Sequence, residues 1–164
     1  MNFQFSISTE RLLIQPLSAG DNYFILELLN TEGWIKFIGD RNIHSAADAD
    51  AYIQKILNNE NLFYWTVKLK QNGKTIGIIT FIKRDYLAHH DIGFAFLPQF
   101  SQKGYAYEAT TAVLTKLQTE HKLSHILAVT LPQNKDSVSL LVKMGFAFEK
   151  EIEIGKENLL VYGI

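Results

Sequence analysis

An Asn-Gly pair between two runs of strand-forming residues is the feature that most narrows the fold of this chain. The runs Leu62 to Leu69 and Thr75 to Lys83 are rich in Ile, Val, Thr and aromatic residues, and they flank Asn72-Gly73. Asn-Gly favours a tight hairpin because both residues tolerate positive φ. A third run, His90 to Leu97, follows and ends before a proline. The sequence therefore predicts a central antiparallel meander.

After the meander, the spacing of apolar residues predicts helices that alternate with strands. Alanine, valine and leucine recur at helical spacing from Ala106 to Leu117, so we expect a helix that ends near His121. The elements expected after it are a strand, a helix and two closing strands: His125 to Thr130, Lys135 to Met144, Phe146 to Ile154 and Leu159 to Tyr162. A meander followed by a βαβ crossover indicates an α/β fold with a mixed sheet.

The first sixty residues read as a short strand followed by helices. The strand lies within Phe5 to Pro16, and Asp21 is placed to cap a helix. Trp34 to Ile38, between two glycines, is expected to form one irregular helical turn. Ser45 is the expected cap of a helix that stops at Asn58. No linker or repeat interrupts the chain, so residues 1–164 are expected to form one domain.

Composition excludes several classes of protein. The 164 residues carry 16 Lys and Arg against 17 Asp and Glu, without the basic excess typical of proteins that bind nucleic acid or membrane surfaces. No cysteine is present, which excludes disulfides and a cysteine nucleophile. Five scattered histidines without a carboxylate cluster predict no metal site. Met1 to Glu10 does not resemble a signal peptide and no apolar run would span a membrane, so we expect a soluble cytoplasmic protein.

The segment from Asp91 to Ala106 is the first with chemical meaning. A strand runs into a short loop in which Gly104 opens directly into a helix. The first N–H groups of a helix lack partners and lie at its positive end, so a glycine-opened turn can hold a pyrophosphate. Lys103 adds a positive charge beside it. An ordinary turn before a helix gives the same pattern, and this segment alone does not decide between them.

A second polar segment follows one βα crossover later. Asn134 and Ser137 precede a helical run that ends at Gly145-Phe146. Asn134 is explained equally well as an N-cap, and Gly145 as the glycine that ends a helix.

Together these segments resemble the GNAT superfamily of N-acetyltransferases. The run from Gln102 to Ala109, Gln-Lys-Gly-Tyr-Ala-Tyr-Glu-Ala, is similar to the acyl-CoA pyrophosphate loop of that family, Gln/Arg-x-x-Gly-x-Gly/Ala. Asn134-x-x-Ser137, leading to Gly145-Phe146, resembles the next family segment. Thr9-Glu-Arg-Leu12 resembles the start of the ribosomal-protein alanine and serine N-acetyltransferases. The resemblance covers essentially the whole chain, in order.

The resemblance implies a mostly antiparallel sheet with a splayed parallel pair, Asp91–Leu97 and His125–Thr130, and flanking helices. It implies acetyl-CoA as cosubstrate and no metal. Pantetheine would lie between the splayed strands, the pyrophosphate on the loop, and Asn134 beside the pantetheine arm or the acetyl end. The implied cosubstrate-binding residues are Phe94, Ala95, Phe96, Gln102, Lys103, Gly104, Tyr105, Ala106 and Asn134.

The resemblance also implies two catalytic candidates. Ser137 is placed to protonate or hydrogen-bond the departing thiolate, although it could also be a plain residue of a helix's first turn. Asp91 stands where related enzymes carry a glutamate that draws the amine proton through water, and strand alternation puts it on the face of Gly93 and Ala95. The alternative for Asp91 is an exposed carboxylate at a strand start.

The chain departs from the family pattern at several positions. Ser101 replaces the first Gln or Arg of the pyrophosphate pattern, and Val129 and Leu141 stand where some relatives have a glutamate and a tyrosine. A base and an acid must therefore come from elsewhere or be dispensable. A non-catalytic acyl-CoA-binding or regulatory module is the alternative function. A P-loop kinase is excluded because Gly-x-x-x-x-Gly-Lys-Ser/Thr is missing.

The resemblance implies that the acceptor is a primary amine. A peptide N-terminus and a small molecule both remain possible, because the fold does not decide between them. Trp34 and Phe37 are candidates for the core or for the acceptor wall. His89 and His90 are expected to be solvated loop residues. The protein is expected to act as a monomer or homodimer.

Overall fold

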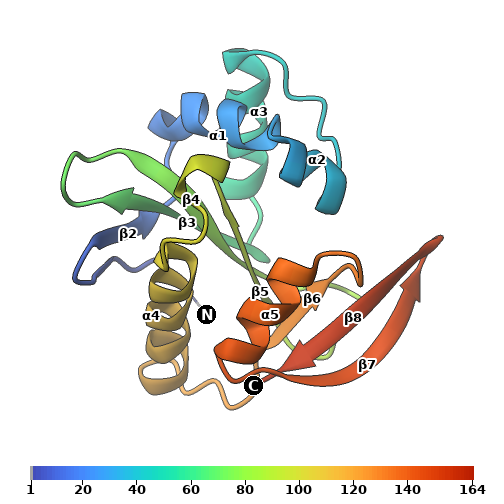
Figure 1. The fold of residues 1–164 in the computed structure, drawn as a ribbon. Coiled ribbons are helices and arrows are strands. Elements are labelled where there is room, and N and C mark those ends of the chain that lie inside the picture. Colours follow the sequence, from blue (N-terminus) through green and yellow to red (C-terminus); the bar gives the residue numbers. More distant parts are fainter. Residues whose placement is uncertain (1) are drawn as a thin grey trace.

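An eight-stranded mixed sheet organises the protein (Figure 1). The structure, a computed structural model, describes residues 2–164. The strands run in the spatial order β1-β2-β3-β4-β5-β6-β8-β7. Their bounds are β1 (Ile7–Ser8), β2 (Leu12–Pro16), β3 (Leu62–Leu69), β4 (Thr75–Ile82), β5 (Asp91–Phe96), β6 (Leu127–Thr130), β7 (Ala147–Ile154) and β8 (Glu157–Gly163).

Five α-helices and two short 3-10 helices connect these strands. The α-helices are α1 (Asn22–Leu29), α2 (Glu32–Phe37), α3 (Ala46–Leu57), α4 (Tyr105–Thr119) and α5 (Lys135–Lys143), and the 3-10 helices are η1 (Ala19–Asp21) and η2 (Pro98–Phe100). Among residues 2–164 no helix is long and apolar enough to cross a membrane.

The central meander expected from the sequence is confirmed. Strands β2 to β5 pair antiparallel in succession, and the Asn-Gly segment forms the β3–β4 turn. Gly73 there has a φ of 71°, the left-handed conformation that favours glycine, and the Asn72 side chain accepts a hydrogen bond from the backbone N–H of Lys74 at 3.0 Å. Local turn chemistry therefore fixes this hairpin.

The parallel pair β5–β6 is splayed, as the family resemblance implied. The two strands pair at one position only, Asp91 with Leu127, where the Leu127 N–H donates to the carbonyl of His90 at 3.0 Å. All other neighbouring strands pair antiparallel. Beyond Asp91 the sheet is thus open between two of its central strands.

Apolar side chains cover both faces of the sheet. One buried cluster joins the strands to the apolar stripe of α4, with α5 contributing Leu141. The other cluster holds α1, α2 and α3 against the opposite face, on which Ile78 of β4 lies. Because α4 packs on β5 and α5 packs on β6, the two helices begin on either side of the opening (Figure 1).

One expectation about the elements was wrong, and two features of the sheet were not predicted. Trp34 to Ile38 is not an irregular turn, because α2 is a regular helix that begins after Thr31, whose hydroxyl accepts from the Trp34 N–H at 3.3 Å. The N-terminal strand is divided into β1 and β2, which pair with each other. The two closing strands do not follow chain order in the sheet, since β8 lies between β6 and β7.

Candidate active site

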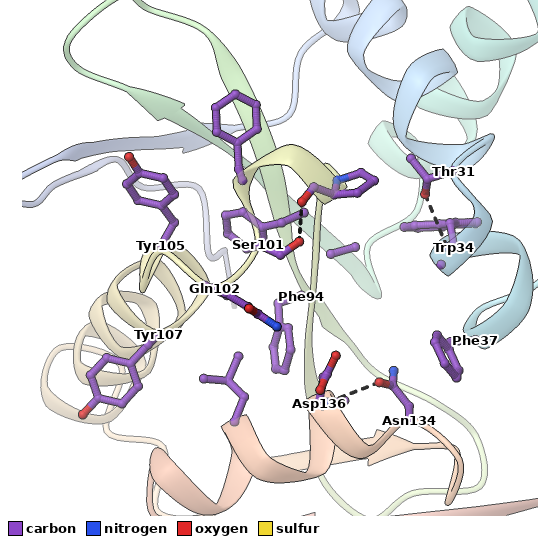
Figure 2. A pocket seen from close by; sticks show the side chains of 18 of the residues that line it. Thr31, Trp34, Phe37, Phe94, Ser101, Gln102, Tyr105, Tyr107, Asn134 and Asp136 are labelled. Atoms are coloured by element: carbon purple, nitrogen blue, oxygen red, sulfur yellow. Dashed lines mark hydrogen bonds between the residues drawn. The ribbon is translucent and has the colours of Figure 1, made fainter.

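The opening between β5 and β6 leads into a cleft of about 620 Å³ (Figure 2). Phe94 of β5 lies at its centre, with the Gln102 side chain beside it. Asn134 and Asp136 reach it from α5. Trp34 and Phe37 close it from α2. The cleft therefore joins four parts of the chain that are far apart in the sequence.

The loop before α4 presents backbone donors to this cleft. Ser101 N–H donates to Pro98 at 3.1 Å, and Glu108 N–H donates to Gly104 at 3.0 Å. Between them, the N–H groups of residues 102–107 have no acceptor within the part of the chain that the structure describes. Gln102 and Gly104 have φ values of 56° and 79°, which turn the loop onto the helix. Free amides at the positive end of a 15-residue helix are the kind of group that can hold an anion.

Arg11, the residue before β2, holds this loop in place. Its Nη1 donates to the Lys103 carbonyl at 2.9 Å and its Nε donates to Glu108 at 2.7 Å. Its guanidinium carbon lies 4.4 Å from the centre of the Tyr105 ring. A Cβ on Gly104 would come within 3.3 Å of the Arg11 Nη2 atom, so the guanidinium also packs on the glycine.

Glu108 is fixed by three donors from the segment before β2. Besides the Arg11 side chain, the Thr9 hydroxyl donates to Glu108 Oε1 at 2.6 Å and the Arg11 N–H donates to it at 3.0 Å. Burial acts to raise the pKa of Glu108, but these hydrogen bonds outweigh burial and lower the pKa. The Thr9-Glu-Arg-Leu12 motif thus has a structural role that sequence reasoning did not find, namely support of the loop before α4.

Backbone N–H and C=O groups alternate along β5 between the β4 side and the open side. Leu97 N–H donates to Ile76 on the β4 side, whereas the His90 carbonyl accepts from Leu127 on the β6 side. Because backbone groups alternate along a strand, Phe94 and Phe96 present theirs to the gap and Ala95 presents its own to β4. The Ala95 side chain nevertheless lines the cleft.

Asn134 and Ser137 lie together at the start of α5. Asn134 Oδ1 accepts from the Ser137 N–H at 3.2 Å, so Asn134 is the N-cap of this helix. Its side-chain amide nitrogen donates to no group among residues 2–164, and both residues line the cleft. The capping role and a role in binding are therefore compatible.

A second hollow of about 300 Å³ continues the cleft past these two residues. Both hollows are lined by Trp34, Phe37, Ile38, Phe94, Ala95, Asn134 and Ser137, so they meet at this common wall. Trp34 is only 5% exposed and packs with α1 and α3, which makes it a core residue and a wall residue at once.

Asp91 lies in this second hollow, at the closed end of the splay. It is 3% exposed, and Arg84 Nε donates to its Oδ1 at 2.7 Å. Burial raises the pKa of the Asp91 carboxyl, and the neighbouring Arg84 charge offsets only part of that effect. The alternative of an exposed carboxylate is therefore excluded. Val129 also lines this hollow.

The histidines take no part in the cleft. His89 is exposed as expected, but His90 is half-buried and stacks on Phe81 with 4.7 Å between ring centres, so it is not a solvated loop residue. Burial, with the nearby Lys83 charge, lowers the pKa of His90. Across residues 2–164 no group of three or more His, Asp or Glu side chains comes together in a way that could hold a metal ion.

Known proteins share this architecture and sequence. Residues 11–147 match the acetyltransferase (GNAT) domain family. The uncharacterized N-acetyltransferase YnaD of Bacillus subtilis is 32% identical over 157 residues, which covers 92% of this chain and 90% of the relative. The crystal structure of a GNAT-family acetyltransferase from Bacillus anthracis is 28% identical, with a TM-score of 0.82 and 98% of each chain covered.

A more distant structure supports the fold alone. The ribosomal-protein-S5-alanine acetyltransferase of Vibrio fischeri has a TM-score of 0.82 at 18% identity, with 98% of this chain and 96% of that one covered. The family match spans both the loop before α4 and the start of α5. The chain belongs to the GNAT family and is an acetyl-CoA-dependent acetyltransferase.

Proposed function

We propose that the protein moves the acetyl group of acetyl-CoA directly onto an amine, with both substrates in the cleft together. One observation carries this proposal: β5 and β6 pair at a single residue, and two hollows that share lining residues lie beside the opening beyond it, one lined by the loop before α4 and the other by Asp91. Adjacent spaces with free amides at one end and a buried carboxylate at the other suit direct transfer. The whole described chain acts as one domain, since the cleft uses parts of it from α2 to α5.

The cosubstrate would bind along the first hollow. In this proposal the amides of Gln102, Lys103, Gly104, Tyr105 and Ala106 hold the pyrophosphate. The backbone groups of Phe94 and Phe96 bond the pantetheine arm as an added strand would. The Asn134 amide nitrogen, which donates to no group among residues 2–164, donates to the arm or to the acetyl end.

The reaction itself requires positioning more than it requires side-chain chemistry. The amine nitrogen attacks the thioester carbon, a C–N bond forms, and the C–S bond breaks to release a thiolate. Holding the two reactants in attack geometry contributes about 7–11 kcal/mol to such a step. Ser137, in the first turn of α5, donates its hydroxyl proton toward the departing sulfur, and the positive end of the helix favours the developing negative charge.

Removal of the amine proton falls to Asp91, directly or through water. Burial raises the pKa of Asp91 and so strengthens it as a base, but a carboxylate is still a weaker base than an aliphatic amine. Presenting a neutral amine near pH 7 costs about 4–5 kcal/mol for a lysine side chain but only about 1 kcal/mol for a peptide N-terminus. We therefore propose an α-amine or another amine of low pKa as the acceptor. The name of the Vibrio fischeri neighbour, an alanine acetyltransferase of ribosomal protein S5, places peptide N-termini in the first test panel.

The test is an assay of thiol release from acetyl-CoA against a panel of peptide N-termini, amino acids, polyamines and aminoglycosides. Release that depends on the acceptor, with the acetylated amine found by mass spectrometry, is the expected result. Protection of the protein from thermal unfolding by acetyl-CoA, without release for any amine, would contradict the proposal and favour a non-catalytic acyl-CoA-binding module.

A further inference from the structure

The acceptor half of the cleft, meaning the second hollow of about 300 Å³, contains an excess positive charge. Of its described lining residues, Asp91 is the acidic one, and Arg41 and Arg84 are the basic ones. Arg84 is committed to Asp91 through the 2.7 Å ion pair. Arg41 makes no ion pair or hydrogen bond with any of residues 2–164. Arg41 is therefore the one charged lining group without a partner in this part of the chain.

The position of Arg41 is defined by the bend after α2. Gly39, with a φ of 115°, turns the chain, and a Cβ on this glycine would lie 3.3 Å from Arg41 Nη1. The guanidinium thus packs over the bare glycine backbone. Arg41 and Tyr64 both line the acceptor half, Arg41 as an exposed residue.

The hydroxyl groups of the acceptor half can donate hydrogen bonds. Burial, followed by the neighbouring Tyr52, raises the pKa of Tyr64, so its hydroxyl stays protonated. Tyr52, Thr80 and Thr130 add further hydroxyls to the lining. A space lined by donors and one unpartnered guanidinium suits an oxygen anion and repels a second positive charge.

We propose that the acceptor is an amine that also bears a carboxylate, and that Arg41 binds this carboxylate while the amine reaches the thioester. The proposal rests on the acetyl transfer proposed above and adds the charge of the acceptor to it. Polyamines, which bring only positive charge, are poor acceptors on this reasoning. A guanidinium can bond both oxygens of a carboxylate, so Arg41 orients the acceptor as well as attracting it.

The sharpest test uses acceptors that differ only in charge. The C-terminally amidated dipeptides Ala-Glu and Ala-Gln have nearly the same size and the same type of α-amine. We expect the kcat/KM for Ala-Glu amide to exceed that for Ala-Gln amide by roughly tenfold, the size of one charge-assisted hydrogen bond. Alanine compared with alaninamide, at equal concentration of neutral amine, tells whether an α-carboxylate serves as well as a side-chain carboxylate.

Variants assign the preference to Arg41. In R41Q the kcat/KM values for the two dipeptides become equal, and a melting temperature that acetyl-CoA raises as it does in the wild type shows that the variant is folded. In R41E the preference changes to Ala-Lys amide. Lys36→Gln is the matched control, because it removes a positive charge from α2 that does not line the acceptor half, and it should leave the preference intact.

The outcomes separate this inference from the proposed function. Turnover with equal rates for both dipeptides, or with polyamines preferred, would overturn the role of Arg41 and leave acetyl transfer standing. A preference for Ala-Glu amide that persists in R41Q would assign it to another group. Absence of thiol release with every acceptor would overturn both proposals.

Discussion

Replacing Arg11 by methionine should weaken the use of acetyl-CoA without harming the reaction itself. Methionine retains an apolar stem over the Tyr105 ring but loses the guanidinium that bonds the Lys103 carbonyl and Glu108. Without that bond the Lys103 carbonyl is free to rotate, and the amides of the loop before α4 lose their common orientation. The part of the cosubstrate that should suffer is the pyrophosphate.

The size of the effect follows from the two bonds that are lost. A hydrogen bond to a charged group contributes about 1.5–3 kcal/mol when buried, whereas exposed ion pairs contribute well under 1 kcal/mol. The Arg11 side chain is 41% exposed and that of Glu108 is 19% exposed, which places the pair between these limits. A total loss of roughly 1–2 kcal/mol corresponds to a fall of about 5- to 30-fold in kcat/KM for acetyl-CoA.

The assay compares two acetyl donors. S-Acetylpantetheine has the thioester and the pantetheine arm but no pyrophosphate, so its kcat/KM should change by less than about twofold in R11M. Lys116→Met is the control, since it removes a cation from the last turn of the same helix, where it pairs with Glu120 at 2.7 Å. Equal losses with both donors would show that Arg11 supports the fold in general. No loss with either donor would show that the loop holds its shape unaided.

Three further predictions concern the cleft itself. Gly104→Glu should abolish the rise in melting temperature that acetyl-CoA gives the wild-type protein, because a carboxylate would occupy the anion site, and an unchanged rise would refute that assignment. Ser137→Ala should lower kcat by about tenfold while the Kd for acetyl-CoA, measured by calorimetry, stays within about twofold of wild type. The helix cap should survive, since Asn134 accepts from the Ser137 backbone rather than from its hydroxyl. A change in melting temperature without a change in kcat would contradict a catalytic role for the hydroxyl. Asp91→Asn should reduce turnover by about 10²-fold near pH 7 and recover as pH rises, because free amine then loses its proton to water. In the wild type, burial raises the pKa of Asp91, so lowering the pH should protonate Asp91 and reduce activity at a higher pH than for an ordinary carboxyl group. An Asp91→Asn variant with activity within about threefold of wild type over about pH 6.5–9 would remove Asp91 from the mechanism.

The elements that sequence predicted well are those with local causes. The hairpin at Gly73 depends on the residues of its own turn, and Ser45 caps α3 by accepting from Asp48 only three residues ahead. Gly104 marks the start of α4 for the same reason, because the residue before the helix adopts positive φ. Family resemblance then supplied what local chemistry does not, namely the splay of β5 and β6.

The features that sequence missed depend on distant partners. Arg11 and Glu108 are 97 residues apart, and the local sequence around either residue does not predict their contact. The Arg84 pair with Asp91 spans a turn between two strands, so the burial of Asp91 was not evident from its place at a strand start. Likewise, β8 rather than β7 pairs with β6, and the residue pattern within each strand does not encode that choice.

The single residue pair between β5 and β6 would make the stability of the protein depend on bound acetyl-CoA. Strands β6, β8 and β7 join the rest of the sheet at that one position, and a pantetheine arm in the gap would bond groups on both sides of it. A ligand that binds only the folded chain stabilises it by about 2.7 kcal/mol at a concentration of 100 times its Kd. The lifetime of such an enzyme against unfolding and proteolysis would then rise and fall with the supply of acetyl-CoA, so that starvation would deplete the catalyst as well as its substrate.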